Sequence, residues 1–423
     1  MIVRKICQGL AVLTLIFSSL NAWAASYSIV CQVSPGTDIN RVASALQGKV
    51  LDEVLDFTYL LSVPTMPGTN LPTGVIYCEA NAKTSLPGFR GAVFSLRTGA
   101  ADLWYRSQPA LMLIKTDRAV AISKGRGIVI ADIDSAVDYS HPALRGVLTS
   151  GKDFIAEKKL SSGTGSLNQA TASFLDQSTA SFLDQATASF LDQATASFLD
   201  QATASFLDQS TASFLDTHSP GHGHATMVAG ILAAIASESM VMPLRAFDDS
   251  GQADASDIAK AIRYAVKNGA KVINMSFGVT SSSKTLQNAI KYAVKNNVVL
   301  VASAGNGNTD KVQYPAGYTG VIGVGATDLK DRKAYFSNFG AAVDVAAPGV
   351  NIISSYPGGH YAVLSGTSFA GPMVAAEAAL LLWEKPQAAV EKPIEMSAKR
   401  LNPLYRLGAG RVNLYGALRE LMK

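Results

Sequence analysis

The feature that most constrains the fold of this chain is an alternation of apolar runs and amphipathic segments from residue 127 onward. Short continuous apolar runs fit strands that are buried on both faces of a parallel sheet, and a 3.6-residue apolar period fits helices that cover it. We expect strands over 127–133, 241–247, 271–277, 298–304 and 321–327, and helices over 226–236, 256–268 and 284–296. The predicted fold class is therefore α/β, with a mostly parallel sheet covered by helices.

A second constraint is the stretch 365–374, Ser-Gly-Thr-Ser-Phe-Ala-Gly-Pro-Met-Val, which opens an Ala- and Leu-rich run to Trp383. Glycine permits a tight turn before Ser368, and a helix tolerates Pro372 near its start. We expect Ser368 on the first turn of a buried helix, facing free N–H groups and the positive end of the helix dipole. Such a position favours a developing negative charge, although an isolated serine there could simply cap a core helix.

The whole string resembles the nucleophile motif of subtilisin-like serine proteases, the subtilases. Two upstream motifs complete the resemblance in the family's order: 133–142, which contains Asp134, and 221–230, which contains His224. The resemblance runs from about Trp104 to the C-terminus. It implies a subtilisin-like fold with helices on both faces of the sheet. It also implies a serine endopeptidase that forms an acyl-enzyme through Asp134, His224 and Ser368.

Three residues depart from the family pattern and leave an alternative open. Ala136 and Ala225 stand where glycine is usual, and Asp132 replaces an apolar residue two places before Asp134. Alternate strand residues share a face, so two buried carboxylates this close should not both ionise, and Asp132 could share the orienting role. The alternative is a catalytically weak or inactive subtilase-like protein that uses its cleft and its repeats for binding.

The resemblance also suggests an oxyanion donor and a substrate-binding segment. Asn306, in 302–307, resembles the oxyanion asparagine of the family, whereas the simpler interpretation of Asn-Gly after a strand is a turn. Polypeptide substrate would bind extended beside Ser276, Phe277 and Gly278, adding a strand to that segment.

Metal and cofactor chemistry has little support in the sequence. His218, His222 and His224 could form a metal cluster, but no nearby carboxylate or cysteine completes a zinc shell. We expect no cofactor; calcium is possible by family resemblance, but no site can be assigned. Glu377 is an acid among Ala and Leu, and the sequence does not show what surrounds it.

The N-terminal region predicts export. Residues 1–24 have the basic start, the apolar run and the Ala-x-Ala end of a signal peptide, and the run is short for a membrane span. We expect a periplasmic or secreted protein without a membrane span, in which Cys31 and Cys78 form a disulfide. We expect residues 25–103 to form a small α+β domain that is either a removable propeptide or a permanent domain. Residues 104–423 should form the peptidase domain.

An insertion interrupts the predicted peptidase domain. Residues 169–216 are six copies of one octapeptide, Gln-Ala-Thr-Ala-Ser-Phe-Leu-Asp or its Gln-Ser-Thr version. We expect a loosely structured surface insertion, with stacked strands as the alternative. Without these 48 residues, Asp134 and His224 would be 42 rather than 90 positions apart, closer to the normal family spacing.

Composition excludes one class of partner. The net charge of +4 is small for 423 residues, and the basic residues are scattered, so we expect no nucleic-acid binding. A third possibility, an export-associated structural protein carrying the repeats, stays open at this stage.

Overall fold

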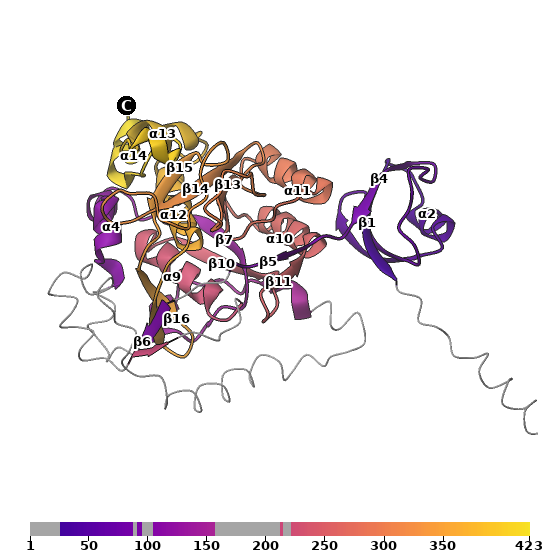
Figure 1. The fold of residues 1–423 in the computed structure, drawn as a ribbon, viewed down its shortest axis with the longest axis horizontal. Helices are drawn as coiled ribbons and strands as arrows, with labels where there is room; N and C mark the ends of the chain where they lie inside the picture. The colour runs from indigo at the N-terminus through magenta and orange to yellow at the C-terminus, as the bar shows by residue number, and fades with distance from the viewer. Residues whose placement is uncertain (1–25, 88–90, 95–104, 157–211, 215–220) are drawn as a thin grey trace, which may run out of the picture. The chain divides into compact units, whose positions relative to one another are not determined.

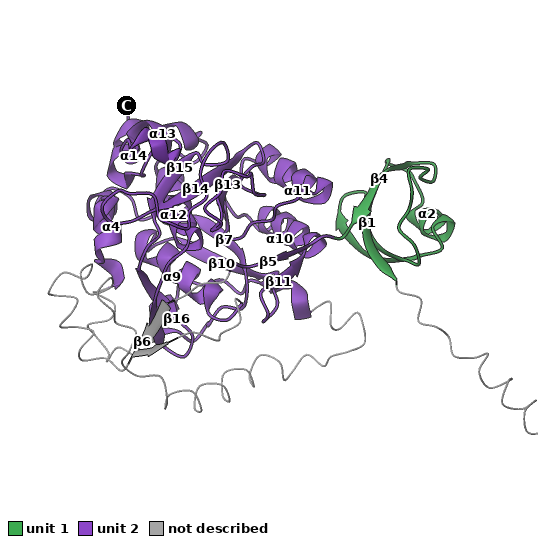
Figure 2. Ribbon diagram, viewed as in Figure 1, with its two compact units in different colours: residues 1–81 green, residues 82–423 purple. Residues whose placement is uncertain are grey.

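The computed structural model describes residues 26–87, 91–94, 105–156, 212–214 and 221–423. The chain divides into two compact units at Asn81 and Ala82 (Figure 2). This division comes before the boundary expected at 103 and 104. The reason is that β5 (Lys83–Ser85) pairs with β11 (Gln252–Asp254), and β6 (Gly91–Phe94) pairs with β17 (His360–Leu364). Both early strands therefore belong to the larger unit.

The smaller unit is an antiparallel sheet with one helix. Its strands, in the order β2-β3-β1-β4, are β2 (Lys49–Leu55), β3 (Thr58–Val63), β1 (Tyr27–Val33) and β4 (Val75–Ala80). Helix α2 (Ile39–Ala45) begins after Asp38, whose carboxylate accepts the Asn40 N–H as an N-cap. The pairing of β1 with β4 places Cys31 opposite Cys78, and the expected disulfide joins them.

The larger unit contains a seven-stranded sheet in which every paired strand runs parallel. Its strand order is β15 (Val345–Pro348), β14 (Val321–Thr327), β13 (Val299–Ser303), β12 (Val272–Met275), β7 (Val129–Asp134), β10 (Met240–Arg245) and β8 (Lys152–Asp153). The chain adds β8 and β10 on one side of β7 and β12 to β15 on the other. In parallel sheets, ligands bind outside the carboxyl ends of the strands where the order reverses in this way.

Two pairs of helices cover the sheet (Figure 1). Helices α9 (His224–Ile235) and α12 (Thr367–Glu384) pack together on one side, and α10 (Ala255–Lys267) packs with α11 (Lys284–Lys295) on the other. Every residue of α9 is buried, and so is nearly all of α12, because both consist largely of small or apolar residues. Helix α10 instead buries one stripe, which includes Ile258, Ala261 and Ile262, as its apolar period predicts.

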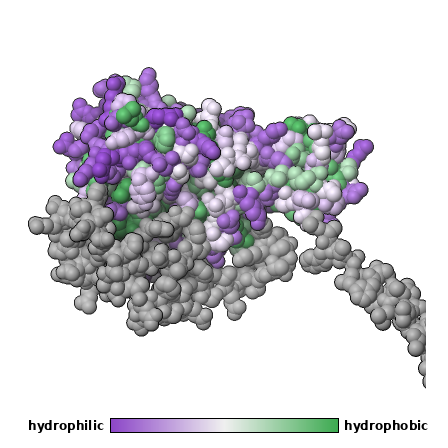
Figure 3. All heavy atoms as spheres, in the orientation of Figure 1, coloured by the Kyte–Doolittle hydropathy of each residue, from purple (hydrophilic) through white to green (hydrophobic). Residues whose placement is uncertain are grey.

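The remaining elements are short. A second sheet has the order β16-β17-β6-β9, with β16 (Ile352–Tyr356) and β9 (Ala212–Phe214). The short helices are α4 (Pro109–Leu113), α5 (Thr116–Ala119), η2 (Pro142–Leu144), α13 (Glu391–Ser397), η3 (Pro403–Tyr405) and α14 (Leu414–Leu421). On the face drawn in Figure 3, hydrophilic residues gather over α13 and α14.

Two predictions lie largely or wholly outside the described residues. The signal peptide at 1–24 is not described at all, and of the repeat insertion only 212–214, within the last copy, is described. Among the helices of the described part of the chain, none combines the length and the apolar character that a membrane crossing requires.

Glu377 is the buried acid whose surroundings the sequence left open. It lies inside α12 and is 1 % exposed, and no described residue donates a hydrogen bond to either carboxylate oxygen. Burial raises the pKa of Glu377 well above its usual value. The unfolded chain therefore releases this proton at a lower pH than the folded chain does, and folding loses stability between the two pKa values.

We predict that Glu377→Met increases the free energy of unfolding, and that the increase grows as pH rises above about 4.3. The growth is at most about 1.4 kcal/mol per pH unit and stops at the folded-state pKa. Guanidinium denaturation at pH 4, 6 and 8 measures it. Glu384→Met, at the partly exposed end of the same helix, is the control; an equal gain for both variants at every pH would contradict the prediction.

Candidate active site

The predicted site residues lie where strands end or helices begin. Asp134 is the last residue of β7, Ser276 follows β12, and Asn306 follows β13 by three positions. His224 is the first residue of α9, and Ser368 is the second residue of α12. Because β7, β12 and β13 are parallel neighbours, their carboxyl ends meet at one edge of the sheet, where the two helix starts are also placed.

Asp134 and His224 form a buried pair. The Nδ1 atom of His224 lies 2.7 Å from one carboxylate oxygen of Asp134 and 2.9 Å from the other. Neither residue is more than 1 % exposed, and the Ser135 N–H also donates to Asp134. A proton on Nδ1 is therefore directed at the carboxylate, which fixes both the orientation of the ring and its tautomer.

Ser368 is held at the end of β12 by two reciprocal hydrogen bonds. Its Oγ donates to the Ser276 carbonyl at 3.1 Å, and the Ser276 Oγ donates to the Ser368 carbonyl at 2.9 Å. The hydrogen of the Ser368 hydroxyl is thus directed at the Ser276 carbonyl. The next residue, Phe369, has its ring centroid 5.7 Å from that of His224, so α12 begins beside the imidazole.

Two of the three residues of the predicted substrate segment, Ser276 and Phe277, are buried, and Gly278 is partly exposed. The Phe277 side chain is buried against Phe247, with ring centroids 5.0 Å apart, and the Ser276 side chain is buried and bonded to α12. At Gly278 an added Cβ would lie 2.7 Å from the Gln313 Oε1, so a residue with a side chain would displace Gln313.

Asn306 has its carboxamide oriented by the residue before the serine. Its Oδ1 accepts hydrogen bonds from the Thr367 N–H at 2.9 Å and from the Thr367 Oγ1 at 2.7 Å. Its Nδ2 lies on the other side, 3.4 Å from an ideal Cβ built on Gly366. Sequence reasoning missed Thr367, although its place between Gly366 and Ser368 could have indicated such a role.

Asn338, in the stretch 336–340, was also missed by the sequence reasoning. Its Oδ1 accepts the N–H groups of Gly307 and Thr309, and its Nδ2 donates to the Ala304 carbonyl at 2.8 Å. The side chain is 2 % exposed. Asn338 therefore holds the loop that carries Asn306 on both sides of that residue.

Asp132 is buried beside Asp134 and has a partner. The Asn274 Nδ2 donates to its Oδ1 at 2.9 Å, and the side chain is 2 % exposed. Burial raises the pKa of Asp132 well above its usual value and the charge of Asp134 raises it further, whereas the Asn274 hydrogen bond opposes both. Asp132 thus holds its proton more tightly than an exposed aspartate does, and Asp134 is the carboxylate that contacts the imidazole.

The other histidines near the site have separate contacts. The ring of His222 packs against Tyr356 with centroids 5.6 Å apart. The His141 Nε2 donates to the His360 carbonyl at 2.8 Å, and its Nδ1 accepts the Ala143 N–H, which gives it a structural role.

His218, the third member of the possible metal cluster, lies outside the described residues. Within the described ranges, no group of three His, Cys, Asp or Glu could hold a metal, and we assign no calcium site there.

The two alanines at family glycine positions do not need glycine's backbone freedom. Neither Ala136 nor Ala225 has a positive φ. Ala136 is exposed, and Ala225 lies in the first turn of α9.

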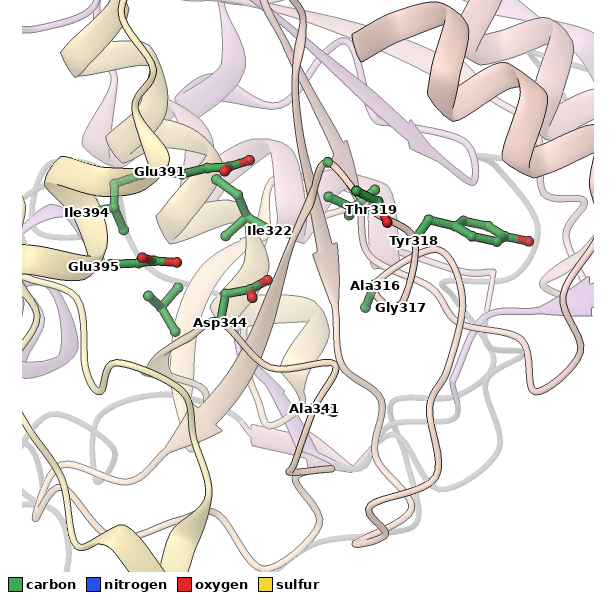
Figure 4. Close-up of a pocket in the computed structure, with 13 residues that line it drawn as sticks. Ala316, Gly317, Tyr318, Thr319, Ile322, Ala341, Asp344, Glu391, Ile394 and Glu395 are labelled. Carbon is green, nitrogen blue, oxygen red and sulfur yellow. The ribbon is translucent and has the colours of Figure 1, made fainter.

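A pocket of about 280 Å³ lies apart from these residues, between β14 and α13. Figure 4 shows Glu391 and Glu395 extending from α13 toward the part of the pocket where Asp344 lies. Burial raises the pKa of Glu391, and the charges of Asp344 and Glu395 raise it further. The Asp344 carboxylate accepts the Gly323 N–H at 2.7 Å. The pocket contains none of the predicted site residues.

Comparison with known proteins identifies the family. The model of the subtilase family matches residues 125–411. The chain belongs to the subtilase family. It is 35 % identical to a thermophilic serine proteinase of Bacillus sp. (strain AK1) over 72 % of this chain and 65 % of that protein. It is 32 % identical to thermitase of Thermoactinomyces vulgaris over 72 % of this chain and 93 % of thermitase. The chain thus spans slightly less than two thirds of the Bacillus relative.

Solved structures agree on the fold of this subtilase. Fervidolysin from Fervidobacterium pennivorans, a keratinolytic enzyme related to subtilisin, superposes with a TM-score of 0.67 at 24 % identity, covering 94 % of this chain and 62 % of fervidolysin. The prenylagaramide maturation protease PagA gives 0.53 at 25 % identity, covering 72 % of this chain and 98 % of PagA. The family resemblance and the subtilisin-like α/β fold predicted from the sequence are therefore confirmed.

Gly223 shows how the start of α9 is fixed. It precedes His224 with φ +77°, and an added Cβ would lie 2.2 Å from a ring carbon of Tyr356. We predict that Gly223→Ala lowers the free energy of unfolding by about 2 kcal/mol or more, because the backbone strain and the ring contact add. Gly127→Ala is the matched control: φ is +74° and nothing lies within 4 Å of the Cβ, so only the strain of about 1 kcal/mol applies. Equal losses in denaturant titrations would show that the Tyr356 contact is unimportant.

Proposed function

We propose that this subtilase is an exported serine endopeptidase in which Asp134, His224 and Ser368 form the catalytic triad. The observation that carries the proposal is the buried contact of His224 Nδ1 with both carboxylate oxygens of Asp134, at 2.7 and 2.9 Å. With the Nδ1 proton directed at Asp134, the Nε2 atom of His224 is the one that can accept a proton from Ser368.

The reaction begins when Ser368 exchanges one hydrogen bond for another. Rotation about its Cα–Cβ bond releases Oγ from the Ser276 carbonyl and presents it to the imidazole. Hydroxyl contacts of this kind often tighten only when substrate is bound. His224 then takes the Oγ proton as Ser368 attacks the scissile carbonyl, and it returns that proton to the leaving amine. Water attacks the acyl-enzyme by the same route.

The tetrahedral oxyanion would be held by Asn306 Nδ2 and the Ser368 N–H. Thr367 occupies the oxygen of the Asn306 carboxamide through two donors, which leaves the amide nitrogen for the substrate. The Ser368 N–H belongs to the first turn of α12, where backbone donors have no partner within the helix. Two donors fixed before the reaction stabilise the charge without reorganisation.

Substrate would bind as an extended chain along the backbone of Ser276, Phe277 and Gly278. Because Ser276 and Phe277 are buried and the partly exposed Gly278 has no side chain, main-chain hydrogen bonds rather than side-chain contacts would hold the substrate here.

The alternative, a weak or inactive binding protein, was based on Ala136, Ala225 and Asp132. Neither alanine has a positive φ, and Asp132 accepts a hydrogen bond from Asn274, whereas His224 contacts Asp134. None of the three departures removes a group that the reaction needs. The other alternative, an export-associated structural protein, makes a different prediction: its role would be lost on deletion of residues 169–216 and would be kept in a Ser368→Ala variant.

We predict that the purified protein hydrolyses casein and that Ser368→Ala removes the activity. The corresponding loss in subtilisin, a member of the same family, is about 10⁶-fold. A serine-directed fluorophosphonate should label the unsubstituted protein at Ser368 and should not label the variant. A chain without residues 169–208, the first five copies of the octapeptide, keeps β9; it is the control and should keep its activity. A folded protein that neither cleaves casein nor reacts with the fluorophosphonate would favour the binding alternative.

We also infer that any processing of the N-terminal region leaves 82–94 with the peptidase domain. Removal of everything to 103 would take β5 from β11 and β6 from β17, whereas a cut at Asn81 and Ala82 breaks neither pairing. The intact mass of the exported protein distinguishes the two cuts from each other and from a chain that keeps its N-terminal domain.

A further inference from the structure

A continuous chain of hydrogen bonds links β7 to the first turn of α12 beneath the proposed catalytic groups. The Asn274 Nδ2 donates to Asp132 Oδ1 at 2.9 Å and to Ser276 Oγ at 3.0 Å. The Ser276 Oγ in turn donates to the Ser368 carbonyl at 2.9 Å. The side chains of Asp132, Asn274 and Ser276 are all buried, so water does not compete for these bonds.

The strand register explains why these residues meet. Asn274 on β12 is directly opposite Asp132 on β7, and paired residues of neighbouring parallel strands point to the same face. Ser276 is two positions after Asn274, so it continues on that face beyond the end of β12. One carboxamide therefore connects the strand that carries Asp134 with the residue that contacts Ser368.

The carboxamide of Asn274 is held through its nitrogen. Both hydrogens of Nδ2 have acceptors, whereas no described residue donates to its Oδ1, which faces Gly371 of α12. Without an acceptor at Asp132, one Nδ2 hydrogen would be buried without a partner, and the amide would lose the contact that fixes its rotation.

We propose that Asp132 is a positioning residue for the peptidase reaction: through Asn274 and Ser276 it fixes the first turn of α12, and with it the place of Ser368 beside His224. This inference rests on the proposed function. Asp132 does not touch substrate, and the role requires only that it accept a hydrogen bond. The raised pKa is consistent with this role, because a protonated carboxyl group still accepts through its second oxygen and adds no second charge beside Asp134.

The test compares two substitutions of Asp132 that differ in one property. Asp132→Asn keeps an oxygen that can accept from Asn274, and Asp132→Val removes it. We expect Asp132→Val to lower kcat about tenfold with KM changed less than about threefold, because the nucleophile is displaced more than the substrate-binding backbone. We expect Asp132→Asn to recover most of that loss. Rates are measured on a peptide substrate and divided by the concentration of active sites titrated with fluorophosphonate.

A double-mutant cycle tests the route through Asn274. If Asp132 acts through the amide, Asn274→Ala lowers kcat by a similar factor, and the double variant with Asp132→Val is no slower than either single variant. Asp257→Asn is the matched control, because Asp257 is a buried acid outside the site, on α10, with Lys260 3.0 Å away. It should leave kcat and KM unchanged.

Three results would overturn the inference: an unchanged kcat in Asp132→Val, an Asp132→Asn variant as slow as Asp132→Val, or multiplied losses in the double variant. If Asp132→Val does not fold, the kcat of Asn274→Ala is compared with that of the double variant Asn274→Ala with Asp132→Asn. Losses of kcat that multiply in this double variant would also count against the inference. If the unsubstituted protein has no activity, the proposed function fails, and a crystal structure of Asp132→Val decides the positioning question. An Asn274 still bonded to Ser276 would overturn it, and an Asn274 turned away would support it.

Discussion

The buried contact between Asp134 and His224 is the interaction on which the rest of the site depends. A carboxylate that is 1 % exposed is costly unless a donor faces it, and His224 Nδ1 and the Ser135 N–H are its donors. The pair joins the last residue of β7 to the first residue of α9, which are 90 positions apart. The long insertion is compatible with this contact because loop length adds little to the entropy of closure once the ends are held.

Around that pair, side chains hold backbone in place as well as one another. Asn338 holds the loop of Asn306 by three hydrogen bonds, Thr367 orients the Asn306 amide, and Ser276 binds the first turn of α12. Each of these contacts joins segments that follow different strands, of the parallel sheet or, for α12, of the second sheet. These hydrogen bonds attach the loops and helix starts of the site to the rigid sheet, and they keep in place groups that would otherwise be free to move.

The fold and the main site residues could be predicted because their patterns are long or specific. The helices over 256–268 and 284–296 and the strand over 321–327 were predicted to within one residue, since buried strands and amphipathic helices have clear periods. The short strands β15, β16 and β17 were missed, because four or five residues have too little pattern to distinguish them from loops. Thr367 and Asn338 were missed for another reason: their roles are set by partners 29 to 61 positions away, which no local pattern reveals.

The two buried acids that looked alike in the sequence have different physical situations. Asp132 is opposite a register partner that can donate to it, so part of the cost of its burial is recovered as a hydrogen bond that also orients Asn274. Glu377 is on a helix face where no described residue donates to it, and it lowers the free-energy cost of its burial by keeping its proton. A strand places side chains opposite predictable neighbours, whereas the surroundings of a fully buried helix are set by tertiary packing. For that reason we propose a positioning role for Asp132, whereas Glu377 lowers the stability of the fold by an amount that increases with pH.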